Sequence, residues 1–116
     1  MPLASLDALT PETPIGPANA DRSLPVPLKS QGASFAGDGA LWLSQSGSTF
    51  GTLTRHDPET GAQTARYAMP PGIEDIGFAP DGKLWAVSEA GALRYTNWNQ
   101  IFPFVFAIDI NQLKAE

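Results

Sequence analysis

Short apolar stretches separated by turn residues follow one another from Gln31 to the end of the chain. Leu41–Leu43 and Leu84–Val87 are almost continuously apolar, which is typical of strands that are covered on both faces. Residues 51–56 alternate with polar side chains, and residues 62–69 form the next stretch of strand character. The pattern predicts an all-β protein in which residues 31–72 supply four short antiparallel strands.

The turns between these stretches have recognisable chemistry. Asp38-Gly39 and Asp81-Gly82 are Asp-Gly pairs, which provide the positive φ that a tight hairpin requires. In residues 57–61, Asp57 caps the turn, a proline fixes the next φ, and Gly61 takes a positive φ at the end. Asp38 and Asp81 are therefore interpreted as structural turn caps.

Two segments of the chain repeat one another. Residues 31–42 align without a gap with residues 74–85, at a constant offset of 43 residues, and six of the twelve aligned positions are identical. The shared residues are Phe, Ala, Asp, Gly, Leu and Trp. A period of about 40–45 residues with strand-like content is typical of β-propeller blades.

The second copy is less regular than the first. Residues 91–95 are expected to form its third strand or the loop before it, and the strongly apolar residues 102–110 to form its last strand, with Phe104, Phe106, Ile108 and Ile110 on one face. Such a strand requires a partner, because a bare apolar edge promotes aggregation. Trp42 and Trp85 occupy the same place in the two copies and are each expected to fill the gap between adjacent sheets.

The first thirty residues differ from the rest, because six of the 11 prolines lie there. Proline removes a backbone donor, so this segment is predicted to be irregular, with one helical turn at Ser5–Leu9. The chain is thus divided into an irregular segment (1–30), a first blade (31–73) and a second blade (74–116). The predicted fold class is two four-stranded antiparallel propeller-type blades, a partial β-propeller.

Charge and composition narrow the function. The net charge is −5 without any basic run, so neither nucleic acid nor an anionic membrane surface is an expected partner. No stretch is long and apolar enough for a transmembrane helix, and the first residues lack the regions of a signal peptide. The absence of cysteine excludes thiolate chemistry, and the single histidine, His56, excludes a multi-histidine metal site within one chain.

The phrase GIEDIGFAPDGKLWAVSE at residues 72–89 resembles blades of the gluconolactonase-like (SMP-30-type), streptogramin-lyase-like and NHL-type propellers. This resemblance covers about residues 31–95 and implies a ring of six or so blades, of which this chain carries two. It also implies a ligand, and often one divalent cation such as calcium, at the mouth of the central channel. Full-length proteins of this kind are often exported.

The resemblance directs attention to the start of each innermost strand, which holds Gln31 in one copy and Glu74 and Asp75 in the other. Carboxylate and amide oxygens there suit a hard cation, with Glu74 as the metal ligand, and a metal-bound water would attack a lactone or ester. The alternative is that Glu74 and Asp75 are solvated loop acids.

Two further residues are candidate ligand contacts. Glu89 follows the second strand of its copy and is either part of a ligand rim or an ordinary exposed acid. Trp98, between two asparagines, either stacks on a sugar ring or packs under the final strand. His56 is expected to be an exposed turn residue, and no G-x-S-x-G motif supports a serine hydrolase.

Two functions remain. One is a binding or structural scaffold, and the other is a metal-assisted lactonase, esterase or lyase whose site requires further blades. Because repeat proteins generally need three or more units, the chain is expected to be the C-terminal part of a longer propeller, a subunit that associates with other copies of itself, or a small two-sheet sandwich.

Overall fold

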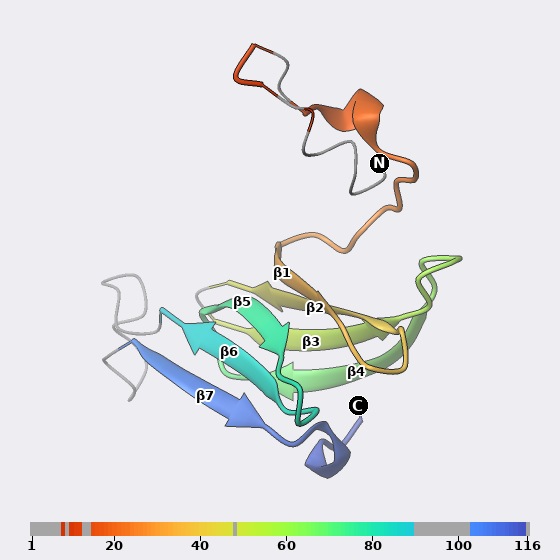
Figure 1. Ribbon diagram of the computed structural model, residues 1–116. Helices are drawn as coiled ribbons and strands as arrows, with labels where there is room; N and C mark the ends of the chain where they lie inside the picture. Colours follow the sequence, from red (N-terminus) through yellow and green to blue (C-terminus); the bar gives the residue numbers. More distant parts are fainter. Residues whose placement is uncertain (1–7, 9, 13–14, 48, 90–102, 116) are drawn as a thin grey trace.

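The computed structural model describes residues 8, 10–12, 15–47, 49–89 and 103–115 of the chain. Within these ranges the protein contains β-strands and short 3₁₀ turns and no α-helix, which confirms the all-β prediction. The chain forms two antiparallel sheets that lie against each other (Figure 1). The strands are β1 (Ser30–Phe35), β2 (Leu41–Ser46), β3 (Gly51–His56), β4 (Gln63–Met69), β5 (Ile73–Phe78), β6 (Leu84–Ser88) and β7 (Phe104–Ile108).

Sheet A contains β1 to β4 in chain order, so each strand pairs with its sequence neighbour. The register places Trp42 of β2 opposite Ser34 of β1 and Arg55 of β3. The predicted four strands of residues 31–72 are therefore confirmed as one meandering sheet.

The turns follow the predicted chemistry. Gly39, Gly61 and Gly82 have φ angles of 84°, 77° and 83°, in the region that favours glycine. Both Asp-Gly turns are closed in the same way, since Asp38 Oδ1 accepts the N–H of Ala40 at 3.0 Å and Asp81 Oδ1 accepts that of Lys83 at 3.0 Å. The interpretation of both aspartates as turn caps is confirmed.

Sheet B contains three strands, β5-β6-β7, where the sequence predicted four. The place beside β6 is taken by β7, with Val87 opposite Val105, so the apolar strand predicted to be last is the third strand of this sheet. This strand sets half-buried Phe104, Phe106 and Ile108 beside the buried face of β6. The predicted strand at residues 91–95 lies outside the described residues.

The hydrophobic core lies between the two sheets. Sheet A contributes Trp42 and Leu53, which are 3% and 1% exposed. Trp42 stacks on Tyr67 with ring centroids 5.6 Å apart and contacts Phe78 of β5 edge to face at 5.9 Å. Such pairs add about 0.5–1.5 kcal/mol each beyond the area that they bury. Sheet B contributes four buried side chains to this core: Ile73, Ile76, Leu84 and Ala86.

Strand β5 packs directly on β1 and β2. The approach is close, because a Cβ built on Gly32 would lie only 2.7 Å from the carbonyl oxygen of Glu74. Two hydrogen bonds join the sheets: Ser44 Oγ donates to Glu74 O at 2.6 Å, and Ser34 Oγ accepts the N–H of Phe78 at 3.2 Å. The first strands of the two repeat copies are thus neighbours.

Equivalent residues of the two copies lie on opposite sides of the interface. Trp42 points from sheet A into the core, whereas Trp85, at the same repeat position, is 48% exposed on the far side of sheet B. Conversely, Phe78 packs against the core, whereas its equivalent Phe35 is 63% exposed on the far side of sheet A. The sheets are therefore stacked face to back, and the prediction that Trp85 also fills a gap between sheets is wrong for the described chain.

The same geometry corrects the prediction that residues 84–87 form a fully buried strand. In β6, Leu84, Ala86 and Ser88 are buried, whereas Trp85 and Val87 are exposed. Strand β2 of sheet A is almost fully buried, as expected. The difference arises because the described residues place a sheet against only one face of β6.

The described residues of the N-terminal segment are irregular apart from a 3₁₀ turn at Pro17–Asn19, as the prolines predicted. The predicted turn at residues 5–9 lies almost entirely outside the described residues. Residues 22–28, here called the strap, run along the outer face of sheet A (Figure 1). Arg22 pairs with Glu59 at 2.8 Å, Leu24 lies over Gly61, and Val26 lines a small hollow with Ala33 and Leu43. None of the helical segments that the structure describes could span a membrane.

Candidate functional site

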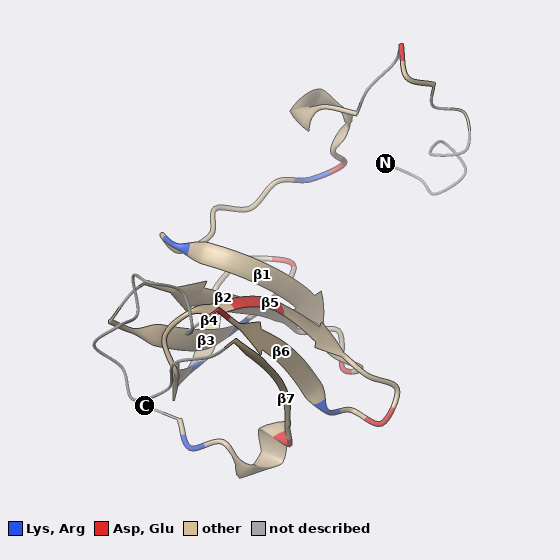
Figure 2. Cartoon of the chain, turned by 90° about the vertical axis from the view of Figure 1, so that its left-hand side faces the viewer, with Lys and Arg blue, Asp and Glu red and all other residues tan. Residues whose placement is uncertain are grey.

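Gln31, Glu74 and Asp75, three of the predicted ligand residues, lie near the starts of β1 and β5. Gln31 is exposed on β1, and β5 carries half-buried Glu74 and exposed Asp75. Asp75 lies close to β1, since a Cβ built on Gly32 would be 3.0 Å from Asp75 Oδ1. Figure 2 shows the two acidic positions on β5 beside β1. Gln31 lines a small hollow with Val26, Ala33 and Leu43 on the outer face of sheet A, so the structure does not group its side chain with this acidic pair.

The local bonding of this pair is structural. Asp75 Oδ1 accepts the N–H of Ile76 at 2.9 Å, and the carbonyl oxygen of Glu74 accepts the Ser44 hydroxyl. Among the described residues, no three His, Asp or Glu side chains are grouped so that they could hold a metal ion. Whether Glu74 is a metal ligand stays a prediction.

Glu89 lies at the same end as Glu74. It follows β6 directly, the register pairs Ile73 with Ser88, and the N–H of Glu89 donates to Gly72 O at 2.9 Å. Glu89 is half-buried, and whether it contacts a ligand stays a prediction. Trp98 lies outside the described residues.

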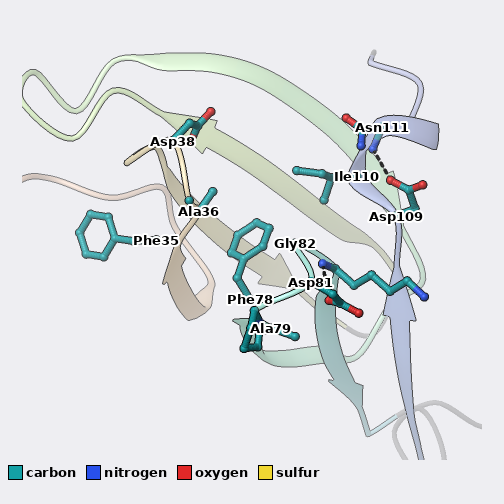
Figure 3. A pocket seen from close by; sticks show the side chains of 13 residues that line it. Phe35, Ala36, Asp38, Phe78, Ala79, Asp81, Gly82, Asp109, Ile110 and Asn111 are labelled. Atoms are coloured by element: carbon teal, nitrogen blue, oxygen red, sulfur yellow. Dashed lines mark hydrogen bonds between the residues drawn. The ribbon is translucent and has the colours of Figure 1, made fainter.

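A large hollow lies at the opposite end of the strands, between the two Asp-Gly turns (Figure 3). It has a volume of about 680 Å³, and residues 109–111 close one side of it. Phe78 points into the hollow between Ala36 and Ile110, whereas Phe35 points away from it. The floor is apolar and the rim carries three carboxylates, from Asp38, Asp81 and Asp109.

Backbone amides hold all three of these carboxylates. Asp109 Oδ1 accepts the N–H of Asn111 at 3.0 Å, in the same manner as Asp38 and Asp81 in their turns. The Ala40 N–H, and next the Arg55 guanidinium at 2.9 Å, hold the pKa of Asp38 below its ordinary value of 3.8. These contacts stabilise the ionised form and shape the turns.

This hollow was not predicted from the sequence. The two Asp-Gly turns could have predicted it, because equivalent hairpin turns in neighbouring sheets lie at the same end of the molecule. The contribution of Asp109 and Ile110 could not be inferred, since it depends on where the chain goes after β7.

His56 is 4% exposed, so the prediction of an exposed turn residue is wrong. Its Nδ1 lies 3.1 Å from Gly61 O, which can only accept, so Nδ1 carries the proton. Its Nε2 lies 2.9 Å from Thr54 Oγ1 and accepts the hydroxyl proton of Thr54, whose oxygen in turn accepts the Gln45 amide at 2.8 Å. His56 therefore completes a buried hydrogen-bond network, a role that depends on the bend after β3 rather than on the residues beside it in sequence.

An apolar surface covers the outer face of sheet B. It consists of Trp85 and Val105, which are 48% and 65% exposed, with Val87 between them in the register. Together with Gly77 and Asp75 these side chains line a shallow hollow of about 250 Å³. Contiguous exposed apolar surface is one of the features by which interaction sites are recognised in folded proteins.

The chain matches no protein-family model, no curated protein and no solved structure.

Proposed function

We propose that this chain is a non-catalytic scaffold built from propeller-type blades, which holds further sheets or a ligand against its outer surfaces. The observation that carries the proposal is the face-to-back stacking of the two sheets. Successive blades of a propeller present the same face to the next blade, so equivalent residues alternate between the two sides of each interface.

The packing of β5 on β1 and β2 supports the same proposal. Innermost strands of adjacent blades meet around a central axis, and Gly32 permits that contact at the carbonyl oxygen of Glu74. The three-stranded sheet B then corresponds to a blade with its fourth strand outside the described residues or absent. The resemblance of residues 72–89 to gluconolactonase-like, streptogramin-lyase-like and NHL-type blades agrees with this assignment.

A scaffold is favoured over an enzyme by the bonding of the acids. The carboxylates around the larger hollow accept backbone amides within their own turns, and Asp75 does so within β5. These bonds are typical of acids that shape the backbone. The metal-assisted lactonase or lyase remains the second candidate, with Glu74 as its cation ligand.

Hydrogen exchange tests the scaffold directly. A scaffold must behave as one rigid unit, so amides of β3 in sheet A and β6 in sheet B should open with similar free energies at low protein concentration. Trp42→Leu should lower both values together. If sheet B exchanged freely while sheet A stayed protected, the two sheets would be independent and the proposal would be wrong.

A separate assay tests the enzyme alternative. The full chain is incubated with aldonolactones and aryl esters, with and without Ca²⁺, and compared with Glu74→Gln. The scaffold predicts hydrolysis at the background rate for both proteins. Turnover that requires Ca²⁺ and is lost in Glu74→Gln, but not in Glu59→Gln, would favour the enzyme.

A further inference from the structure

We infer that the outer face of sheet B binds the outer face of sheet A of a second copy of this chain, with Trp85 of one copy against Phe35 of the other. The inference rests on the proposed blade stacking and names the partner of that stack. The interface between sheets A and B within one copy supports it.

Within one copy, the contact between sheets has Trp42 on one side and Phe78 on the other, with their rings edge to face at 5.9 Å. Each of these residues has an equivalent 43 positions away in the sequence. Trp85 corresponds to Trp42, and Phe35 corresponds to Phe78. Because the sheets are stacked face to back, these equivalents lie on the two opposite outer surfaces.

Both equivalents remain accessible. Trp85 is 48% exposed and Phe35 is 63% exposed, although large aromatic side chains favour burial. The strap covers the outer face of sheet A near Leu43, which is 4% exposed, and leaves Phe35 open. One molecule therefore displays both halves of a contact that it also makes internally.

The neighbouring positions repeat the same relationship. Ile76 and Leu84 are two of the four core residues of sheet B that face sheet A, and their equivalents are Ala33 and Leu41 on the outer face of sheet A. These side chains would meet the apolar surface of Trp85, Val87 and Val105. Sheet B of one copy would thus stack on sheet A of the next copy in the same way as sheet A stacks on sheet B within one copy.

The contact between copies is expected to be weaker than the internal one. The two hydroxyl groups that join the sheets, on Ser34 and Ser44, are replaced by Gly77 and Val87 on the outer face of sheet B. Ala33 is also smaller than Ile76. Apolar contact alone supports the pairing, so a dissociation constant on the order of micromolar or weaker is expected.

Such a contact is heterologous, because the surface used by one copy differs from the surface used by the other. This property provides a complementation test. Phe35→Ser retains the Trp85 surface, and Trp85→Ser retains the Phe35 surface. Each variant alone should associate much more weakly than the unchanged chain, whereas an equimolar mixture should form dimers that do not grow further.

The measurement is sedimentation velocity of the full chain from low micromolar to millimolar concentration. The unchanged chain should show mass increasing with concentration, and each single variant should weaken association by about tenfold or more, as expected for a central aromatic contact. Val105→Ser provides a second variant on the sheet B surface. Phe50→Ser, at an aromatic 43% exposed in the β2–β3 loop, is the matched control and should associate normally.

Three results would overturn the inference. The first is a monomer throughout the concentration range. The second is association lost in Trp85→Ser but unchanged in Phe35→Ser, which would mean that the Trp85 surface binds itself. The third is a mixture no heavier than its two components. Hydrogen exchange at low concentration reports on the scaffold separately, so failure here leaves the internal stacking intact.

Discussion

Trp42 and Trp85 occupy the same position in the two copies of the repeat, yet one is 3% exposed and the other 48%. Both point to the same side of their own sheets. Trp42 meets sheet B there, whereas no described residue covers Trp85 in the same way. The pair of tryptophans therefore allows the stability that comes from packing against a neighbouring sheet to be compared with the stability that comes from the residue's own sheet.

The two tryptophans should therefore differ in their effect on stability. Trp42→Ala removes a large side chain from the core and should lower the free energy of unfolding by about 3–5 kcal/mol. Trp85→Ala should change it by less than about 1 kcal/mol in the monomer. Urea denaturation at low protein concentration measures both values. Equal losses in the two variants would contradict the face-to-back arrangement.

Gly32 should tolerate no side chain. In Gly32→Ala, the added Cβ would lie 2.7 Å from Glu74 O and 2.8 Å from Asp75 Cα, both of them backbone atoms. The sheets would have to separate, at a cost of about 1–3 kcal/mol. Gly77→Ala is the matched control, because nothing lies within 4 Å of its added Cβ. Thermal unfolding should show a lower midpoint for Gly32→Ala only.

The hydroxyl of Thr54 joins two other buried side chains. Thr54→Val keeps the shape but leaves the Gln45 amide and His56 Nε2 without this partner. Since an unsatisfied buried polar group costs about 1–3 kcal/mol, the substitution should lower the free energy of unfolding by at least about 1 kcal/mol. Thr64→Val, at an exposed hydroxyl that bonds Arg55, should have a smaller effect in the same denaturation series.

Two turn aspartates should make stability depend on pH in the acid range. The backbone N–H groups of Thr60 and then Glu59 lower the pKa of Asp57, as Ala40 and Arg55 lower that of Asp38, below the ordinary value of 3.8. The folded state then binds fewer protons than the unfolded state, so stability rises with pH across this window. The stabilisation is complete above the unfolded pKa and is lost as pH falls through the lower folded values.

Thermal midpoints measured from about pH 6 down to about pH 2 should show this loss below about pH 4. The double variant Asp38→Asn with Asp57→Asn retains an oxygen acceptor in each turn and removes the titrating charge. Its midpoint should depend less steeply on pH. A slope equal to that of the unchanged chain would assign the acid sensitivity to other carboxylates.

Local chemistry made much of the fold predictable from sequence. The turns at Gly39, Gly61 and Gly82 require positive φ, and short polar side chains beside them close the hairpins whatever surrounds them. The strand order of sheet A could be predicted from these turns, because strands that are joined by short loops pair as antiparallel neighbours. The places of Gln31, Glu74 and Asp75 near the starts of β1 and β5 followed from the constant repeat offset.

The features that the sequence did not predict depend on distant parts of the chain. The exposure of Trp85 depends on what lies beyond sheet B, and the burial of His56 depends on a bond to Gly61 across the following turn. Strand β7 pairs with β6 although at least fifteen residues separate them in the chain. The hollow between the Asp-Gly turns needs Asp109 and Ile110, which only the path after β7 places there.

A stack whose sheets all face the same way has a direction, and its two ends are chemically different. Adding a copy covers one end and presents another of the same kind, so the contact itself gives no reason for growth to stop. The rotation between successive sheets then decides the outcome. A rotation that returns to its starting point closes a ring, and any other produces an open filament.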